Sequence, residues 1–183
     1  MIIENRHKKP YSEKLFNELC ILYLLADSSN TLDSYVLDRR FGISKRTLYR
    51  YIEEINAACP PLNLHFAGKS KHKYLCADLP EEYDDYELHS YISKNLSKAE
   101  TNDERLCRCM QLLAHNYYCL EPEEYADEEK YNGTVLINGE VFAFSGFDSC
   151  DELYEKTSLR TQQRDIYLIK QVLIKMKEME IRF

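Results

Sequence analysis

The sequence contains no long apolar stretch. Its longest apolar run, around Cys20 to Ala26, is far shorter than the roughly 20 residues with which a helix crosses a bilayer. Residues 1–9 lack the apolar region of a secretory signal peptide. The chain has seven cysteines, an odd number, and unpaired thiols without an export signal favour a reducing compartment. We therefore expect a cytoplasmic protein.

Glycine is scarce, and arrangements of catalytic groups are missing. Only five glycines occur, and none of them forms part of a Gly-rich loop that could cradle a phosphate. His89 and His115 have no nearby Ser or Cys in the setting of a hydrolase triad. Acidic pairs such as Glu123/Glu124 are typical of solvated surface charge. Nothing in the sequence argues for an enzyme or for a bound cofactor.

One short segment combines cysteine and histidine. Cys107, Cys109, His115 and Cys119 offer four soft ligands within thirteen residues. On a continuous helix Cys109 points away from the other three, which is incompatible with a tetrahedral zinc site built from all four. We therefore predict no metal site here and expect cysteines that either pack in the core or act as reactive thiols.

The charge of the chain is divided unevenly along its length. The whole chain has a net charge of −7, but residues 1–76 carry 12 Lys and Arg against 8 Asp and Glu, whereas residues 77–183 carry 12 against 23. Such asymmetry indicates a basic module joined to an acidic one. Because affinity for DNA depends on local phosphate contacts, the overall negative charge does not exclude a DNA-binding protein.

Residues 38–52 have the pattern of a helix-turn-helix. Gly42 follows a helix-like run and can adopt the left-handed conformation that ends a helix. Ile43 can fill a small core inside the turn, and Ser44 can cap the next helix. That helix is predicted over residues 45–58, with a buried stripe formed by Leu48, Ile52 and Ile55.

The other side of this predicted helix is basic and aromatic, with Lys45, Arg46, Tyr49 and Arg50 at helical spacing. A helix with this front, directly after a glycine turn, has the layout of a recognition helix, which fits the major groove of DNA. We expect Arg46 and Arg50 to reach phosphates or guanine edges and Tyr49 to pack on a sugar or a thymine methyl. Ser44, Lys45 and Thr47 are predicted to lie against the DNA near the N-terminus of the recognition helix, residues 44–58.

A β-hairpin is predicted directly after this helix, with strands over residues 62–66 and 72–77 and a turn over residues 67–71. Its tip is rich in lysine. Taken alone, a lysine-rich tip is equally well explained as a solvated turn with no binding role. Directly after a recognition helix, we expect a wing over residues 66–73 that contacts phosphates through Lys69, Ser70, Lys71, His72 and Lys73.

The region from about Lys14 to Ala77 resembles the winged helix-turn-helix at the N-terminus of many bacterial regulators. These include WYL-domain regulators and antiterminator-like regulators of sugar uptake. Tyr51 stands where those families usually have Asp. The resemblance covers about a third of the chain and implies a DNA-binding transcription regulator of a bacterium or a phage. The matching residues are Phe41, Gly42, Ile43, Ser44, Arg46, Thr47, Leu48, Tyr49, Arg50 and Ile52.

The remaining elements are predicted from periodicity and turn signals. The fold class that follows is mainly α (α+β). A winged helix-turn-helix domain over residues 1–79 precedes a small acidic helical domain with one β-hairpin over residues 80–183. Further helices are predicted over residues 12–27, from Thr31 or Asp33 to Arg40, and over 86–98, 101–120 and 158–180; residues 121–130 should be a loop or short exposed helix, and residues 134–144 a hairpin turning at Asn138-Gly139.

The long final helix offers a candidate dimer interface. Its apolar stripe consists of Ile166, Ile169, Leu173 and Met176. Either this stripe closes the core of its own domain, or it also forms a twofold dimer. We favour a homodimer, because a single winged helix reads only a few base pairs.

Two functions from different classes agree with the sequence. The favoured function is a sequence-specific regulator of transcription that binds double-stranded DNA, with the acidic half for dimerisation or for sensing an unknown small-molecule or protein effector. The alternative is a protein-interaction module, in which the winged helix is a scaffold and the acidic half docks a basic partner.

Overall fold

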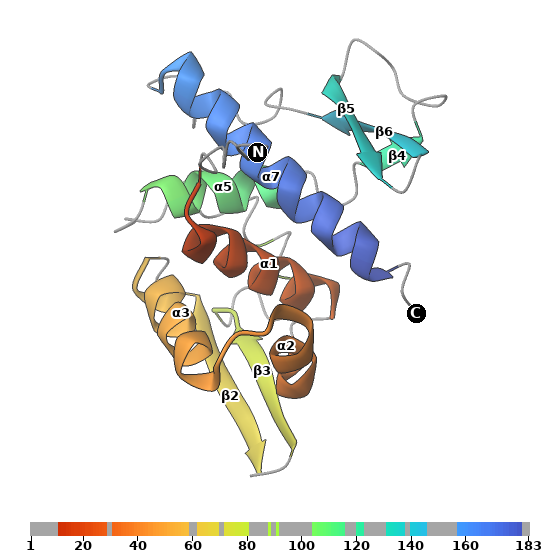
Figure 1. Ribbon diagram of the computed structural model, residues 1–183. Helices are drawn as coiled ribbons and strands as arrows, with labels where there is room; N and C mark the ends of the chain where they lie inside the picture. The colour runs from red at the N-terminus through yellow and green to blue at the C-terminus, as the bar shows by residue number, and fades with distance from the viewer. Residues whose placement is uncertain are drawn as a thin grey trace, which may run out of the picture.

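The protein is mainly α-helical with two small antiparallel sheets (Figure 1). The computed structural model describes residues 11–28, 31–58, 62–69, 72–80, 88, 91, 104–115, 120–122, 131–137, 140–145 and 157–180, and only the backbone of those between 120 and 145. The elements in chain order are α1 (Glu13–Asp27), β1 (Thr31–Asp33), α2 (Ser34–Phe41), α3 (Lys45–Ala58), β2 (Asn63–Lys69), β3 (His72–Asp78), α5 (Glu104–His115), β4 (Leu120–Pro122), β5 (Tyr131–Ile137), β6 (Glu140–Ser145) and α7 (Leu159–Glu180).

Helix α1 lies at the centre of the molecule. Every residue from Glu18 to Ala26 is buried, as expected for a helix that is apolar on nearly all sides. On one side α1 contacts α3, β1 and β3, and on the other it contacts α5 and α7. Figure 1 shows α1 between these two groups of elements. One continuous buried cluster therefore includes residues from both sides of the predicted domain boundary at residue 79, while the division into two domains stays a prediction.

The first sheet has the strand order β1-β3-β2. Strands β2 and β3 pair along their whole lengths, from Asn63 opposite Asp78 to Lys69 opposite His72. The predicted hairpin is thus confirmed, although its strands are longer than expected, because β2 continues to Lys69. Residues 70–71 lie outside the described residues. The face with Leu64 and Leu75 is buried and closes the core beneath α3.

The sequence predicted that the helix after α1 starts at either Thr31 or Asp33, and the structure differs at the first of these positions. Residues 31–33 do not begin a helix but form β1, whose Leu32 pairs with Leu75 in β3. The helix begins after Asp33, whose Oδ1 accepts a hydrogen bond from the Tyr35 N–H at 2.8 Å. A start at Thr31 was therefore wrong, because pairing with a strand more than forty residues later holds these residues extended. The helix begins at Ser34, one residue after the other predicted start, Asp33, which is the last residue of β1.

The second half of the chain agrees with the prediction in part. Leu106, Met110 and Leu113 of α5 are buried as expected. However, α5 ends at His115 and does not reach residue 120, because Leu120–Pro122 forms β4. Pairing with β6 sets this strand at a sheet edge, where proline is tolerated.

Among the other predictions for this half, the hairpin over residues 134–144 is confirmed as β5 and β6. Most of the helix predicted over residues 86–98 lies outside the described residues, as do the capping residues 101–103, the turn at 138–139 and the acidic residues 123–130. Of the described helices, none is both long and apolar enough to cross a membrane.

Helix α7 has nearly the predicted bounds. Ser158 caps it by accepting a hydrogen bond from the Thr161 N–H at 3.3 Å. The stripe proposed as a dimer interface is covered within the single chain, because α7 packs on α1 and α5. Burial therefore agrees with the alternative that the stripe closes the chain's own core: Ile169, Leu173 and Met176 are buried, and Ile166 packs against them half-buried.

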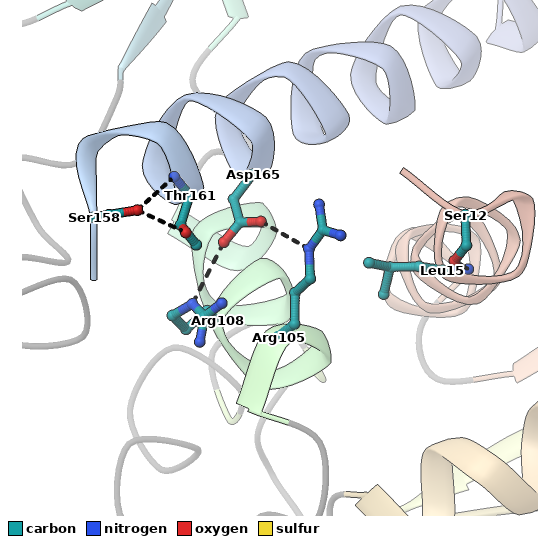
Figure 2. A network of polar contacts seen from close by, with 7 residues as sticks. All are labelled: Ser12, Leu15, Arg105, Arg108, Ser158, Thr161 and Asp165. Atoms are coloured by element: carbon teal, nitrogen blue, oxygen red, sulfur yellow. Dashed lines mark hydrogen bonds and ion pairs between the residues drawn. The ribbon is translucent and has the colours of Figure 1, made fainter. Parts of the chain in front are cut away.

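A buried ionic cluster joins α5 to α7 (Figure 2). The Asp165 side chain has no exposed surface, and its two oxygens lie 3.0 Å from Arg105 Nε and 3.4 Å from Arg108 Nε. Both arginines point from α5 toward this one carboxylate. Beside it, burial raises the pKa of the Cys109 thiol, and the Asp165 carboxylate raises it further. The two arginines supply the counter-charge for an acid inside the protein.

Replacing Asp165 by Asn should lower the free energy of unfolding by about 3–5 kcal/mol, because two arginines lose their shared counter-charge in a buried site. Urea unfolding followed by circular dichroism measures the change. Asp78→Asn is the matched control, since Asp78 is exposed and contacts His65 at 3.2 Å and Asn63 at 3.3 Å; it should cost under about 1 kcal/mol. Equal unfolding midpoints for Asp165→Asn and the parent would contradict the role given to the cluster.

Candidate nucleic-acid interface

The turn before α3 has the local features expected from the sequence. Gly42 adopts a φ of 59°, in the left-handed region, and ends α2 after Phe41. Ile43 is buried inside the turn. Ser44 Oγ accepts a hydrogen bond from the Thr47 N–H at 3.2 Å and lies 2.9 Å from Thr47 Oγ1. Ser44 is therefore the N-cap of α3, and the direction in which α3 leaves the turn is fixed by local contacts.

Helix α3 has one buried side and one exposed side. The buried side includes the predicted stripe and two further positions: Leu48, Tyr51, Ile52, Ile55 and Ala58. Tyr51, which stands where the resembled families usually have Asp, is thus a core residue here. The exposed side, called the α3 front below, consists of Lys45, Arg46, Tyr49, Arg50 and Glu53. The predicted separation of apolar and basic sides is confirmed, while Thr47 is half-buried beside the cap.

The cations of the α3 front have no acidic partner within the described part of the chain. No ion pair there involves Lys45, Arg46 or Arg50. The Arg50 guanidinium lies 5.4 Å from the centre of the Tyr51 ring, a contact that leaves its charge in place. In contrast, Glu54 on the flank of α3 lies 3.0 Å from Lys14 Nζ of α1. The front therefore presents uncompensated positive charge to solvent.

The β2–β3 hairpin is fixed to α3 by three sets of contacts. Asn56 donates from Nδ2 to the Leu64 carbonyl at 2.8 Å and accepts from the Leu64 N–H at 2.7 Å. The Tyr49 and Phe66 rings are 4.7 Å apart between centroids. Lys73 Nζ donates to the Tyr49 hydroxyl at 3.3 Å. Because Tyr49 belongs to the front and Lys73 to the hairpin, these contacts bring the two predicted DNA-contacting segments together.

The predicted hairpin-tip residues are only partly described. Lys69 is exposed at the end of β2, and Lys73 is exposed in β3. His72 begins β3 opposite Lys69, and of it only the backbone is described. Ser70 and Lys71 lie outside the described residues. Two of the five predicted residues therefore stand in β2 and β3 as exposed cations, and of these Lys73 contacts the α3 front through Tyr49.

An open hollow of about 510 Å³ lies on the α3 front, lined by Arg46, Thr47, Tyr49, Arg50 and Glu53. Four of these residues were predicted from the sequence, and Glu53 was not. Its spacing of three from Arg50 and seven from Arg46 was a signal that could have placed it on the same face. The hollow therefore combines cationic donors with one carboxylate.

The other groups considered in the sequence do not form a site in the described residues. Cys107 and Cys109 are buried, and the Cys107 thiol lies 3.9 Å from the Ala58 carbonyl. Burial also raises the pKa of the Cys20 thiol. No group of three metal-ligating side chains comes together there, and the side chains of His115 and Cys119 are not among those described. The two cysteines of α5 are packing residues.

Removing the Asn56 amide should loosen the hairpin from α3. Asn56→Ala leaves the Leu64 N–H and carbonyl without their partners in a half-buried position, which should cost about 1–3 kcal/mol. Hydrogen exchange of the Leu64 amide measures the local effect, and urea unfolding the global one. Asn63→Ala is the control, because the Asn63 side chain is exposed and contacts only Asp78 among the described residues. Unchanged exchange at Leu64 in Asn56→Ala would refute this account.

Comparisons with known proteins do not extend this description. No family model, no curated protein and no solved structure matches the chain. A function for this protein therefore has to follow from its own residues and their geometry.

Proposed function

We propose that the protein is a sequence-specific regulator of transcription that binds double-stranded DNA through a winged helix-turn-helix. In this proposal α3 is the recognition helix in the major groove, and β2 and β3 form the wing along the backbone. The observation that carries the proposal is the α3 front, whose arginines and lysine have no acidic partner in the described part of the chain although the protein is acidic overall.

The charge distribution supports this function. Some cations elsewhere are held in ion pairs, as Arg105 and Arg108 are at Asp165, whereas those of the α3 front are not. Unpaired cations near one another displace condensed counterions from DNA, which supplies most of the affinity for any sequence. The contacts of Asn56 and Tyr49 with the hairpin hold Lys73 beside the same surface. One rigid surface can therefore approach a groove and its flanking phosphates together.

Individual roles follow from position on α3. Ser44 and Lys45 stand at the N-terminus of the helix, where free N–H groups and a lysine suit a phosphate. Arg46 and Arg50 are long enough to reach guanine edges, the commonest specific contact in the major groove. The Tyr49 hydroxyl accepts a hydrogen bond from Lys73. The exposed part of its ring is therefore the part that we expect to contact a sugar or a thymine methyl.

We also propose that the regulator binds DNA as a homodimer in the cytoplasm, since one recognition helix reads only a few base pairs. The stripe of Ile169 and its neighbours is not available for this contact, because it lies in the chain's own core. Among the described residues of α7, the exposed apolar side chains are Leu159 and Tyr167, with 68% and 46% of their surface accessible. A dimer contact through α7 would use that outer face.

Changing Arg46 and Arg50 together to Ala should abolish sequence preference and weaken binding, by about 1–3 kcal/mol for each arginine that reads a base. Fluorescence anisotropy with duplexes selected from a random pool, at low and moderate salt, measures both effects. Arg160→Ala/Arg164→Ala is the matched control, because it removes the same charge from exposed positions of α7. An equal weakening in both variants would mean that general charge, not the α3 front, accounts for binding.

A protein-interaction module is the alternative, and the same experiment separates the two. If the parent shows no binding to duplex DNA at low salt, DNA binding is ruled out, and the acidic half becomes the part with which to search for a basic partner.

The wing should act mainly through charge. Changing Lys69, Lys71 and Lys73 to Ala should weaken binding to specific and non-specific duplexes alike, and should reduce the slope of log K against log salt by up to about 0.9 for each phosphate that the wing no longer neutralises. Binding measured at several salt concentrations gives the slope. Tyr49→Phe is the control, because it removes the hydrogen bond from Lys73 without removing charge. An unchanged slope in the triple variant would place the hairpin away from DNA.

A further inference from the structure

Glu53 lies at the middle of the α3 front, in line with Arg46. Seven residues turn an α-helix by nearly two full turns, so the two side chains leave the helix in directions about 20° apart. They are separated along the axis by about 10.5 Å. Both stand opposite the buried side of α3, which is centred on Ile55, and both line the same hollow. In a helix lying in a groove, this line of residues faces the floor, and the flanking positions face the walls.

The Glu53 carboxylate is free, although cations stand around it. It is exposed, and no ion pair of Glu53 occurs in the described part of the chain, despite Arg50 and Arg46 in the same hollow. Its neighbour Glu54, by comparison, is held by Lys14. A surface made only to contact phosphates would be weakened by such a carboxylate, because like charges repel. Within such a surface, the position of Glu53 suits a partner that donates hydrogen bonds.

The floor of the major groove offers such donors. Cytosine presents its N4 amino group there, and a Glu or Asp side chain accepts from it, while Arg binds the O6 and N7 atoms of guanine. We propose that Glu53 is a specificity-determining residue that accepts a hydrogen bond from a cytosine N4 amino group. That cytosine lies about two to three base-pair steps from a guanine bound by Arg46, since a recognition helix follows the groove and about two turns of it span that many steps.

This inference rests on the proposed function and adds a way of rejecting wrong sites. On a matching site Glu53 gains an amino group as partner. On other sequences, or in a shifted register that brings a phosphate to the hollow, the carboxylate loses its water without a partner. Repulsion of this kind separates specific from non-specific binding as effectively as an added attraction.

The test starts from duplexes that the full-length parent selects from a random pool. The selected sites should share a cytosine and a guanine in the stated spacing. Glu53→Ala should lose preference at the cytosine position and keep it at the others. It should also bind non-specific duplexes more tightly than the parent, because a negative charge has left the front. Glu54→Ala is the matched control, as Glu54 contacts α1, and it should keep the parent's preference at every position.

A second measurement isolates the hydrogen bond. Replacing the selected cytosine by an analogue that lacks the 4-amino group should weaken binding of the parent by about ten-fold or more, the discrimination of one good base contact. Glu53→Ala should not respond to the analogue. An equal response of both proteins, or selected sites without a shared cytosine, would overturn the role of Glu53 while leaving DNA binding intact. Failure of the parent to bind any duplex would instead overturn the proposed function, and this inference with it.

Discussion

The burial of α1 on all sides is the constraint on which the rest of the structure depends. Nine consecutive residues from Glu18 to Ala26 are removed from water, and no single neighbouring helix could cover them. Two groups of elements are therefore required, the helices and sheet of the first half and the helices α5 and α7 of the second. The acidic half of the chain therefore completes the core of the basic half.

Polar contacts then set the position of α3 on this core. Lys14 of α1 lies between the buried Glu18 carboxylate, at 3.6 Å, and Glu54 of α3, at 3.0 Å. On the far side of α3, Asn56 pairs with the main chain of β2. Because hydrogen bonds are directional, whereas apolar packing is not, the two hydrogen bonds of Asn56 limit the rotation of α3 about its axis, and the partly exposed ion pair of Glu54 adds little to them. That rotation decides which side chains reach the α3 front.

The elements that the sequence predicts well are those whose signals are local. The bounds of α3 follow from Gly42, Ser44 and a regular apolar period, and α7 follows from its period and the cap at Ser158. Strand β1 was missed as a strand because its three residues owe their extended form to β3. The burial of Asp165 was not predictable either, since the arginines that neutralise it belong to another helix. Most of the candidate site was predicted because its signals are local, whereas Glu53 was not predicted, although its spacing from Arg46 and Arg50 places it on the same face of α3.

Glu53 and Glu54 show how a step of one residue along a helix gives two identical residues different surroundings. A step of one residue rotates the side chain by about 100°, which carries Glu54 to the flank and leaves Glu53 on the front. The flank faces α1, so Glu54 meets Lys14 and contributes to the packing of the protein. The front faces solvent, so Glu53 keeps its charge among arginines that it does not neutralise. An unpaired carboxylate within an unpaired basic surface gives that surface a pattern of both signs, and such a pattern suits both the acceptor atoms of guanine and the amino donor of cytosine.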